Sequence, residues 1–256
     1  MASPLSVCPA GAVARGIDVS VYQGAVDWSA VASSGIAFAF ARVSDGVGSP
    51  DSSFAANWAG MHAAGLTRGA YQFFRAGEDP AAQAALVLSA LSESGGIGVG
   101  DLPVVMDVET SDGESNEDVR AHMATWLGAI AAGTGKMPVL YTNAATAATI
   151  GSAFGAYPLW VAAWDTSCPS VPTGWSNWAL WQYADTGSVA GIEGAVDLDA
   201  FNGTGSQLLA FTDGAPPDAG GEEVGTTTVG GDGGAGMAMG GGAVVDFRDD
   251  STGCAR

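Results

Sequence analysis

The stretch LPVVMDVET (residues 102–110) decides how the fold is interpreted, because an apolar run ends there in two carboxylates. We interpret the run as a buried strand. Side chains two positions apart in a strand point to the same face, roughly 6.6 Å apart along the chain, so Asp107 and Glu109 should project together. Active sites of parallel barrels lie at the carboxyl ends of their strands. The two acids therefore mark a candidate functional site.

Similar apolar runs recur along the first 143 residues, with helical segments between them. Strands separated by helices indicate parallel βαβ units, and a series of them suggests a closed barrel. The last third has three apolar runs with little helix between them, so we expect an irregular, TIM-like α/β barrel. The expected strands span residues 15–20, 36–43, 69–74, 102–109, 137–143, 158–164, 178–185 and 195–201, and the expected helices span 28–34 and 52–65 or begin near 80 and 115.

The composition changes sharply near residue 212, where Gly, Ala, Thr and acids replace the alternating pattern. Such a segment buries too little apolar area to offset its ordering entropy. We expect an N-terminal extension (residues 1–14), a single barrel domain (15–211) and a disordered, Gly-rich acidic tail (212–256). Cys254 near the end of this tail is either an attachment point or an incidental cysteine.

The formal net charge of −19 reflects a shortage of cations, because 27 acids are ordinary for 256 residues whereas 8 Lys and Arg are few. Proteins that bind nucleic acid need basic side chains for the phosphates, so we expect no nucleic-acid partner. Anionic membranes are disfavoured for the same reason. No run of about 18 apolar residues predicts a membrane span. A neutral polar partner such as a glycan fits this composition better.

Three cysteines do not make a disulfide framework. One alternative is a Cys8–Cys168 bridge with one thiol left over, and the other is three unpaired thiols, since connectivity cannot be read from sequence. The opening MASPLSVCPA has no charged start and no apolar core, so no signal peptide is visible in this chain.

Two further acids fall at positions comparable to those of the first pair. Asp18 ends the first expected strand, and Asp197 lies in the last, with Asp199 two positions on. First and last strands are neighbours in a closed barrel, so Asp18 and Asp197 should be close. Clustered acids raise one another's pKa, which is how a carboxyl stays protonated to act as a general acid. Glycoside hydrolysis uses such sets of acids.

Two alternatives for these acids are structural ion pairs and a metal site. Eight cations in the whole chain make it hard to pair every acid. The two histidines, His62 and His122, fall on expected helices, where a solvated or packed role is more typical than metal ligation. We therefore favour catalysis and expect neither a metal nor another cofactor.

Aromatic residues lie on the expected strands or just past their ends. Sugars present apolar C–H faces that rest on aromatic rings, so the group favours a sugar-binding cleft. The alternative for any one of them is packing in the barrel core. The set comprises Tyr22, Tyr71, Phe73, Tyr141, Trp160, Trp164, Trp181 and Tyr183.

The motifs GIDVSVYQG, FAFARVSDG, LPVVMDVE, PVLYTN, PLWVAAW, WALWQY and GAVDLDAFNG occur in the order found in glycoside hydrolase family 25 lysozymes, which are N-acetylmuramidases. The chain resembles this family over residues 15–203. The resemblance implies a (β/α)5(β)3 barrel with five βα units and three further strands. Its D-V-S-x-Y-Q-G opening and strand-ending D-V-E are specific in combination.

Carried over by position, the resemblance makes Glu109 the general acid and gives Asp107 the task of orienting the substrate's 2-acetamido group. Asp18 and Asp197 would complete an acidic floor that positions water or sugar. The remaining expected substrate-binding residues are Tyr71, Tyr141, Phe73, Trp160, Trp181 and Asp199.

One departure concerns Gln72, where many members of the family carry histidine after the tyrosine of the third strand. Adjacent strand residues point to opposite faces, so we expect Gln72 to face away from the cleft.

The resemblance thus implies a lysozyme that hydrolyses the β-1,4 bond between N-acetylmuramic acid and N-acetylglucosamine with retention and acetamide participation. Its partner would be the glycan strands of bacterial peptidoglycan, at an extracellular or cell-surface location, and the protein would be a monomer. Two alternatives are a glycosidase directed at chitin-like chains and a non-catalytic glycan-binding module.

Overall fold

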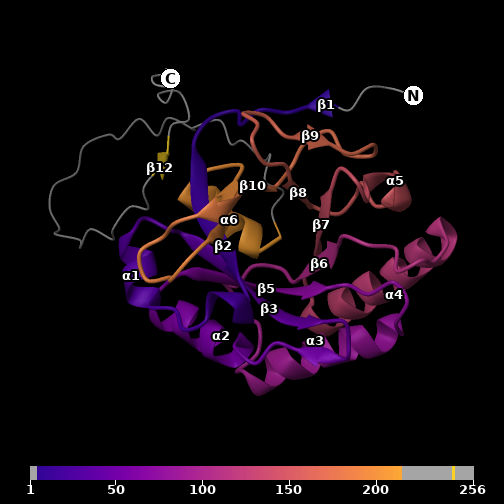
Figure 1. Cartoon of the computed structure of the whole chain (residues 1–256), viewed down its shortest axis with the longest axis horizontal. Coiled ribbons are helices and arrows are strands. Elements are labelled where there is room, and N and C mark those ends of the chain that lie inside the picture. The colour runs from indigo at the N-terminus through magenta and orange to yellow at the C-terminus, as the bar shows by residue number, and fades with distance from the viewer. Residues whose placement is uncertain (1–4, 215–243, 246–256) are drawn as a thin grey trace, which may run out of the picture.

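The computed structural model describes residues 5–214 and 244–245, in which eight strands close a barrel (Figure 1). Around the barrel the order is β2-β3-β5-β6-β7-β8-β10-β11, and β11 pairs with β2 to close it. Only β11 runs antiparallel to both neighbours. The strands are β2 (Val13–Val19), β3 (Phe38–Asp45), β5 (Thr67–Phe73), β6 (Val105–Val108), β7 (Val139–Asn143), β8 (Leu159–Ala162), β10 (Leu180–Gly187) and β11 (Val196–Phe201).

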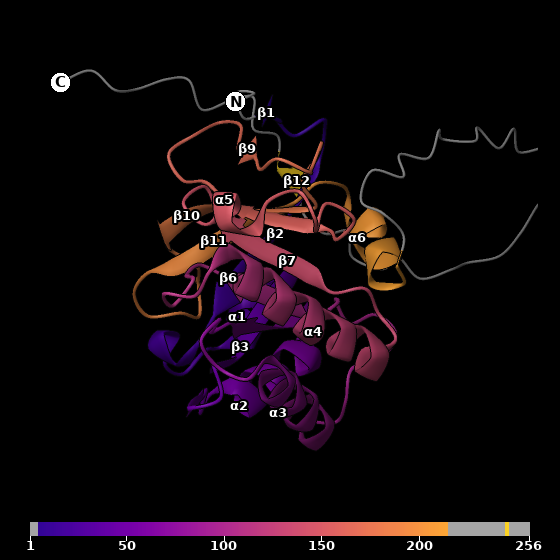
Figure 2. The same cartoon turned by 90° about the vertical axis from the view of Figure 1, so that its right-hand side faces the viewer.

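Five helices follow the first five barrel strands, which confirms the expected irregular (β/α)5(β)3 architecture. Both views place α1 to α4 on one side of the barrel, whereas β8, β10 and β11 have no helix between them (Figures 1 and 2). The helices are α1 (Trp28–Ser33), α2 (Phe54–Ala63), α3 (Pro80–Glu93), α4 (Asn116–Thr134) and the single turn α5 (Ala147–Ile150).

The starts of the longer helices are set by local chemistry that the sequence indicated. Asp79 caps α3 by accepting from the N–H groups of Ala81 and Ala82, and Pro80 occupies the first helical position. Ser115 caps α4 through the N–H of Asp118. Each cap contributes about 1 kcal/mol and fixes where the chain leaves the carboxyl end of the preceding strand.

Strict alternation along the strands divides the apolar residues into two clusters. Residues such as Ile17, Met106 and Trp181 face outward and pack with the helices and loops. The inward-facing cluster fills the barrel, with Phe38, Phe40, Val105, Tyr141, Trp160, Leu180 and Phe201 among its members. Gly16 and Gly69 make room for it, because a Cβ at either position would lie 2.2 Å from a phenylalanine ring atom.

The amino-terminal end of the barrel is closed by α6 (Gly205–Thr212), which follows β11. Leu208 and Phe211 of α6 belong to the inward-facing cluster, and the rings of Phe211 and Phe201 lie 5.4 Å apart. The interior is therefore a packed core with one open mouth, formed by the carboxyl ends of the parallel strands.

Short strands join peripheral segments to this domain. β1 (Leu5–Ser6) pairs with β9 (Ser170–Val171), and a disulfide joins Cys8 to Cys168. β4 (Ser49–Pro50) pairs with β3, and β12 (Val244–Val245) pairs with the start of β2.

The bridge resolves the alternatives for Cys8 and Cys168, whereas Cys254 lies outside the described residues. Most of the expected tail (212–256) also lies outside them, as do the first four residues of the expected N-terminal extension. None of the described helices is both long enough and apolar enough to span a bilayer.

Candidate active site

A cleft of about 320 Å³ opens at the carboxyl ends of the barrel strands. Five of the residues that line it are acids and one is a cation, Arg42. The acids come from four elements or their ends: Asp18 from β2, Asp107 and Glu109 from β6, Asp185 from β10 and Asp197 from β11. The barrel therefore brings together Asp18, Asp107, Glu109 and Asp197, the four acids that were expected to be catalytic.

Asp107 and Glu109 share a face but differ in exposure. Asp107 is buried between Phe73 and Tyr141, its register partners on the neighbouring strands. Glu109 lies just past the end of β6 and is exposed. Its carboxylate accepts a hydrogen bond from Asn143 Nδ2 at 3.3 Å. One carboxyl is thus held inside the cleft and the other stands at its mouth.

Burial raises the pKa of Asp107 well above its ordinary value, and the nearby charges of Glu109 and Asp18 add to this. The cleft walls partly desolvate Glu109 and raise its pKa as well, whereas hydrogen bonds from Asn143 and Asp107 act in the opposite direction. Both carboxyls therefore hold a proton more readily than in water, and the more deeply buried Asp107 is subject to the stronger causes. Asp107 Oδ1 is buried and has no hydrogen-bond partner in the part of the chain that the structure describes.

Asp18 and Asp197 are direct register partners on β2 and β11, as barrel closure required. Burial, and then the charge of Asp197, raise the pKa of Asp18 well above its ordinary value. Burial also raises the pKa of Asp197 to about 6, and a hydrogen bond from Asp18 opposes that shift. Two neighbouring carboxyls do not both ionise easily, so the state in which the pair holds one proton is favoured.

Aromatic side chains form the walls between these acids. Tyr71, Phe73, Tyr141 and Trp160 all line the cleft. Trp160 separates the acidic mouth from the apolar interior, because it stacks on Phe40 with ring centroids 4.7 Å apart and meets the edge of Tyr141 at 5.0 Å. Burial raises the pKa of Tyr71, so its phenol stays neutral and can donate a hydrogen bond.

Two residues expected to bind substrate lie elsewhere. Trp181 faces outward from β10 and packs in the outer cluster, with its indole N–H on the carbonyl of Ala163 at 2.7 Å. Asp199 is buried inside the barrel and accepts from Trp160 Nε1 at 3.1 Å. Neither residue lines the cleft in this structure.

The sequence did not single out several polar residues of the site. Gln182, adjacent to Trp181, faces into the cleft and contacts Asp18, Tyr141 and Trp164. The period-two alternation could have revealed it, but WALWQYAD has large apolar side chains at both parities, which left the direction of each face open.

Arg42 was also missed, and it is held in the cleft wall by Asp51 at 3.0 Å. Its guanidinium lies 5.0 Å from the ring of Tyr22, a residue of the 3-10 turn Val21–Gln23. The side chain of Asp51 also accepts from Val21 N–H, so one carboxylate fixes both the cation and the turn. Gln72 faces away from the cleft as predicted, where it donates to Ser44 and accepts from Trp126.

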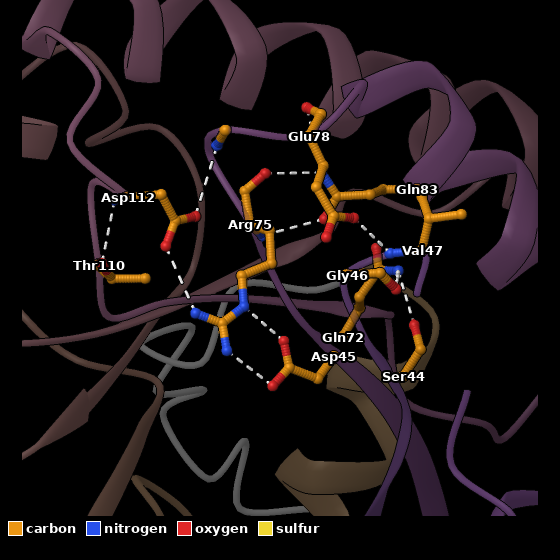
Figure 3. A network of polar contacts seen from close by, with 11 residues as sticks. Ser44, Asp45, Gly46, Val47, Gln72, Arg75, Glu78, Gln83, Thr110 and Asp112 are labelled. Carbon is orange, nitrogen blue, oxygen red and sulfur yellow. Dashed lines mark hydrogen bonds and ion pairs between the residues drawn. The ribbon is translucent and has the colours of Figure 1, made fainter. Parts of the chain in front are cut away.

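Arg75 ties together the loops beside Glu109 (Figure 3). Its guanidinium binds Asp45 at the end of β3 and Asp112 in the loop after β6. It also lies 4.5 Å from the ring of Phe73, which lines the cleft. Asp112 adopts a left-handed backbone conformation (φ 49°), which a non-glycine residue holds only when its surroundings fix it. Arg75 therefore holds the wall from which Glu109 projects.

The arrangement suits proton transfer to a leaving oxygen with stabilisation of a sugar substrate. One carboxyl is exposed at the mouth, a second is buried beside it, and neutral phenols and aromatic faces surround both. Among the residues that the structure describes, no group of three or more His, Cys, Asp or Glu side chains is arranged to hold a metal ion.

Comparisons with known proteins point to the same chemistry. Residues 17–192 match the family described as glycosyl hydrolases family 25. Lysozyme M1 of Streptomyces globisporus is 35% identical over 211 residues, which cover 77% of this chain and 70% of that protein. The uncharacterized protein YegX of Escherichia coli K12 is 37% identical over 212 residues, which cover 80% of this chain and 76% of YegX. A crystal structure of the bacterial lysozyme from Streptomyces coelicolor superposes with a TM-score of 0.72 and 34% identity, covering 78% of this chain and 97% of that one.

Proposed function

The chain belongs to glycosyl hydrolases family 25, a family of glycoside hydrolases, and we propose that it is a lysozyme acting on bacterial peptidoglycan. The bond cleaved is the β-1,4 link between N-acetylmuramic acid and N-acetylglucosamine. The observation that carries this proposal is the pairing of an exposed Glu109 with a buried Asp107 at the end of one strand.

In this proposal Glu109 is the general acid that protonates the glycosidic oxygen. Its position at the mouth lets it reach a bond in a long glycan, and its raised pKa favours the protonated form. In this proposal Asp107 holds a proton in the empty site and supplies it for this step, which the burial that raises its pKa supports. When a donor from the substrate binds Asp107, its ionised form is favoured, and the proton passes to Glu109.

Asp107 orients the 2-acetamido group of the substrate. Its buried Oδ1 has no partner among the described residues, and a buried acceptor without a donor costs about 1–3 kcal/mol. The N–H of an acetamide would satisfy that oxygen. With the N–H held there, the acetamide oxygen can attack the anomeric carbon, which gives retention without an enzymatic nucleophile, a recognised exception to the two-carboxylate scheme.

The remaining cleft residues position sugar and water. Asp18 and Asp197 form an acidic floor that positions the water, and Glu109, ionised after protonating the leaving group, accepts the proton of the water that opens the intermediate. Tyr71, Tyr141, Phe73 and Trp160 provide hydroxyls and apolar faces for the sugar rings.

The site of action that we propose is extracellular or at the cell surface. The Cys8–Cys168 bridge supports it, because structural disulfides form and persist in oxidising compartments. We propose that the barrel domain (residues 15–211) acts as a monomer, which size-exclusion chromatography with light scattering would test.

The function is tested by digesting purified peptidoglycan with the wild-type protein and with Glu109→Gln. Mass spectrometry of the borohydride-reduced fragments identifies the sugar at each new reducing end. Reduced muramic-acid ends from the wild type alone are the expected result. Cleavage of pure chitin oligomers without action on peptidoglycan would instead indicate a chitin-directed glycosidase. Binding to wall material with no fragments from either protein would indicate a glycan-binding module.

A further inference from the structure

Gln182 makes three side-chain hydrogen bonds in the floor of the cleft, and they join groups from four different segments. Its Oε1 accepts from the hydroxyl of Tyr141 at 2.9 Å and from the indole N–H of Trp164 at 3.2 Å. Its Nε2 donates to Asp18 Oδ2 at 2.8 Å. Gln182 itself is buried, so these bonds are shielded from water.

The orientation of this amide is fixed by the indole. A tryptophan N–H only donates, so it must face Oε1 and not the NH₂ group. The hydroxyl of Tyr141 could serve either end of an amide and does not decide the orientation. Once Oε1 faces Trp164, Nε2 must face Asp18. Trp164 is 49% exposed at the edge of the cleft. A residue at the rim therefore determines that Gln182 donates to Asp18 in the floor of the cleft.

The orientation of the Gln182 amide affects which oxygen of Asp18 carries a proton. An amide N–H binds the carbonyl-type oxygen of a carboxyl better than its hydroxyl oxygen, so the bond to Asp18 Oδ2 favours a proton on Oδ1. A proton that the pair holds on Asp18 is then directed away from Gln182. Asp18 and Asp197 are register partners on β2 and β11, so the hydrogen bonds lead from Trp164 through Gln182 to Asp18, directly beside Asp197.

We propose that Gln182 is a positioning residue that holds Asp18 Oδ2 as an acceptor and so fixes where the Asp18–Asp197 pair carries its shared proton. This role rests on the proposed function only for its effect on turnover; which oxygen of Asp18 is favoured for a proton follows from the hydrogen bonds of Gln182. Gln182 acts through Asp18 and not on the reacting bond.

Other charged and titratable groups around Asp18 enter any pH measurement. Asp197 and Asp199 face it from β11, Asp107 and Glu109 from the end of β6, Tyr71 from β5 and Tyr141 from β7. The charge of Arg42, on β3, opposes the rise in the pKa of Asp107. The test must therefore resolve Asp18 itself as well as overall activity.

The informative substitution is Gln182→Glu, which keeps the size and the Oε1 acceptor but replaces the donor with an oxygen. While the new carboxyl is ionised it cannot donate to Asp18, and its charge raises the pKa of Asp18. Once it is protonated at lower pH, it can donate again. We expect kcat on peptidoglycan to fall at least 10-fold at pH 7, to recover partly at acidic pH, and KM to change less than 3-fold.

Gln72→Glu is the matched control. Gln72 is also a buried glutamine whose Oε1 accepts an indole N–H, from Trp126 at 2.6 Å, but it faces away from the cleft. It suffers the same burial of a new carboxyl without touching Asp18. We expect it to lower the melting temperature while kcat and the pH profile of the folded protein stay within 2-fold of the wild type.

A second readout does not depend on turnover. In ¹³C NMR titrations of the carboxyl carbons, with Asp18 assigned by Asp18→Asn, the Asp18 midpoint should rise in Gln182→Glu and stay unchanged in Gln72→Glu. An unchanged midpoint together with an unchanged pH profile in Gln182→Glu overturns the proposal, as does an equal loss in both glutamine variants. If the wild type releases no fragments, the proposed function fails, and the NMR midpoint alone still decides the role of Gln182.

Discussion

The two ends of the barrel differ in a way that cavity size alone would misjudge. The larger hollow, about 680 Å³, lies at the amino-terminal end near α6, and the acidic cleft at the other end measures about 320 Å³. Among the residues that line the larger hollow, two are charged, Lys136 and Asp213. The ammonium of Lys136 already donates to the carbonyls of Asp101 and Thr212. Its charge therefore serves the fold.

The acidic cleft has the opposite character. Its five acids face one cation, Arg42, which is already paired with Asp51. Burial raises the pKa of Asp18 and Asp107, and Asp107 Oδ1 lacks a partner among the described residues. Such groups destabilise the empty protein, so their presence indicates function. Buried carboxyls without cationic partners, and not cavity volume, distinguish the carboxyl end of this barrel as the candidate site.

The largest effect should come from Glu109→Gln. The amide keeps the shape and loses the transferable proton, so we expect kcat to fall about 10³-fold. Binding of wall fragments should change little. Hydrolysis rates and isothermal titration calorimetry on the same fragments check both parts, and a rate within 10-fold of the wild type would remove Glu109 from the acid role.

Asp107→Asn should follow, with a loss of about 10²-fold in kcat, because the amide can present its NH₂ where the acetamide N–H needs an acceptor. The measurement is turnover of peptidoglycan at saturating substrate. A near-normal rate would contradict the orienting role and reduce the contrast between the two ends.

Lys136→Met tests the other end of the barrel. Loss of two hydrogen bonds from a charged donor should lower the free energy of unfolding by about 2 kcal/mol. At a temperature where the variant is folded, kcat should equal that of the wild type. Chemical denaturation and a rate assay together separate these effects; a large fall in kcat would give the amino-terminal end a catalytic role.

Asp197→Asn should stabilise the protein at alkaline pH. The pKa of Asp197 is raised to about 6, above its ordinary 3.8, so the folded state binds the proton more tightly than the unfolded chain. Its contribution is most favourable at low pH and is lost as pH rises from about 4 through 6. Allowing for solvent screening, removal of this charge should add about 1 kcal/mol at pH 8. Thermal denaturation at pH 4 and pH 8 should show the gain only at pH 8.

The smallest effect should follow removal of residues 215–256. The described part of the chain up to Gly214 contains the whole cleft, and within the removed segment only β12 contacts the barrel in the described structure, through Val13 and Ala14. Activity on soluble fragments should stay within 2-fold of the full chain. Failure of the shortened protein to fold would contradict the proposed domain boundary.

Much of this contrast could be predicted from sequence. The i, i+2 spacing of Asp107 and Glu109 places them together in any strand, and barrel closure brings Asp18 to Asp197. The residues that the sequence missed act through contacts between distant segments. Gln182 meets Asp18 across 164 positions, and no local pattern indicates such a contact. Trp181 was favoured over Gln182 because an aromatic residue suggests sugar binding, whereas the parity of the strand depends on packing.

The Cys8–Cys168 disulfide affects which part of the barrel unfolds locally first. On the side of β8 and β10, where helices are absent, the chain from Ala163 to Ala179 is held by β1, by the Cys8–Cys168 bond and by the hydrogen bond from Trp178 to Val7. Whereas α1 to α4 support the wall on the side of β2 to β6, these contacts support the wall formed by β8 and β10. Reduction would leave this wall, which carries Trp164, as the region of fastest hydrogen exchange and the first point of proteolytic entry. The redox state of the surroundings would therefore set how firmly the rim that carries Trp164 is held against the barrel.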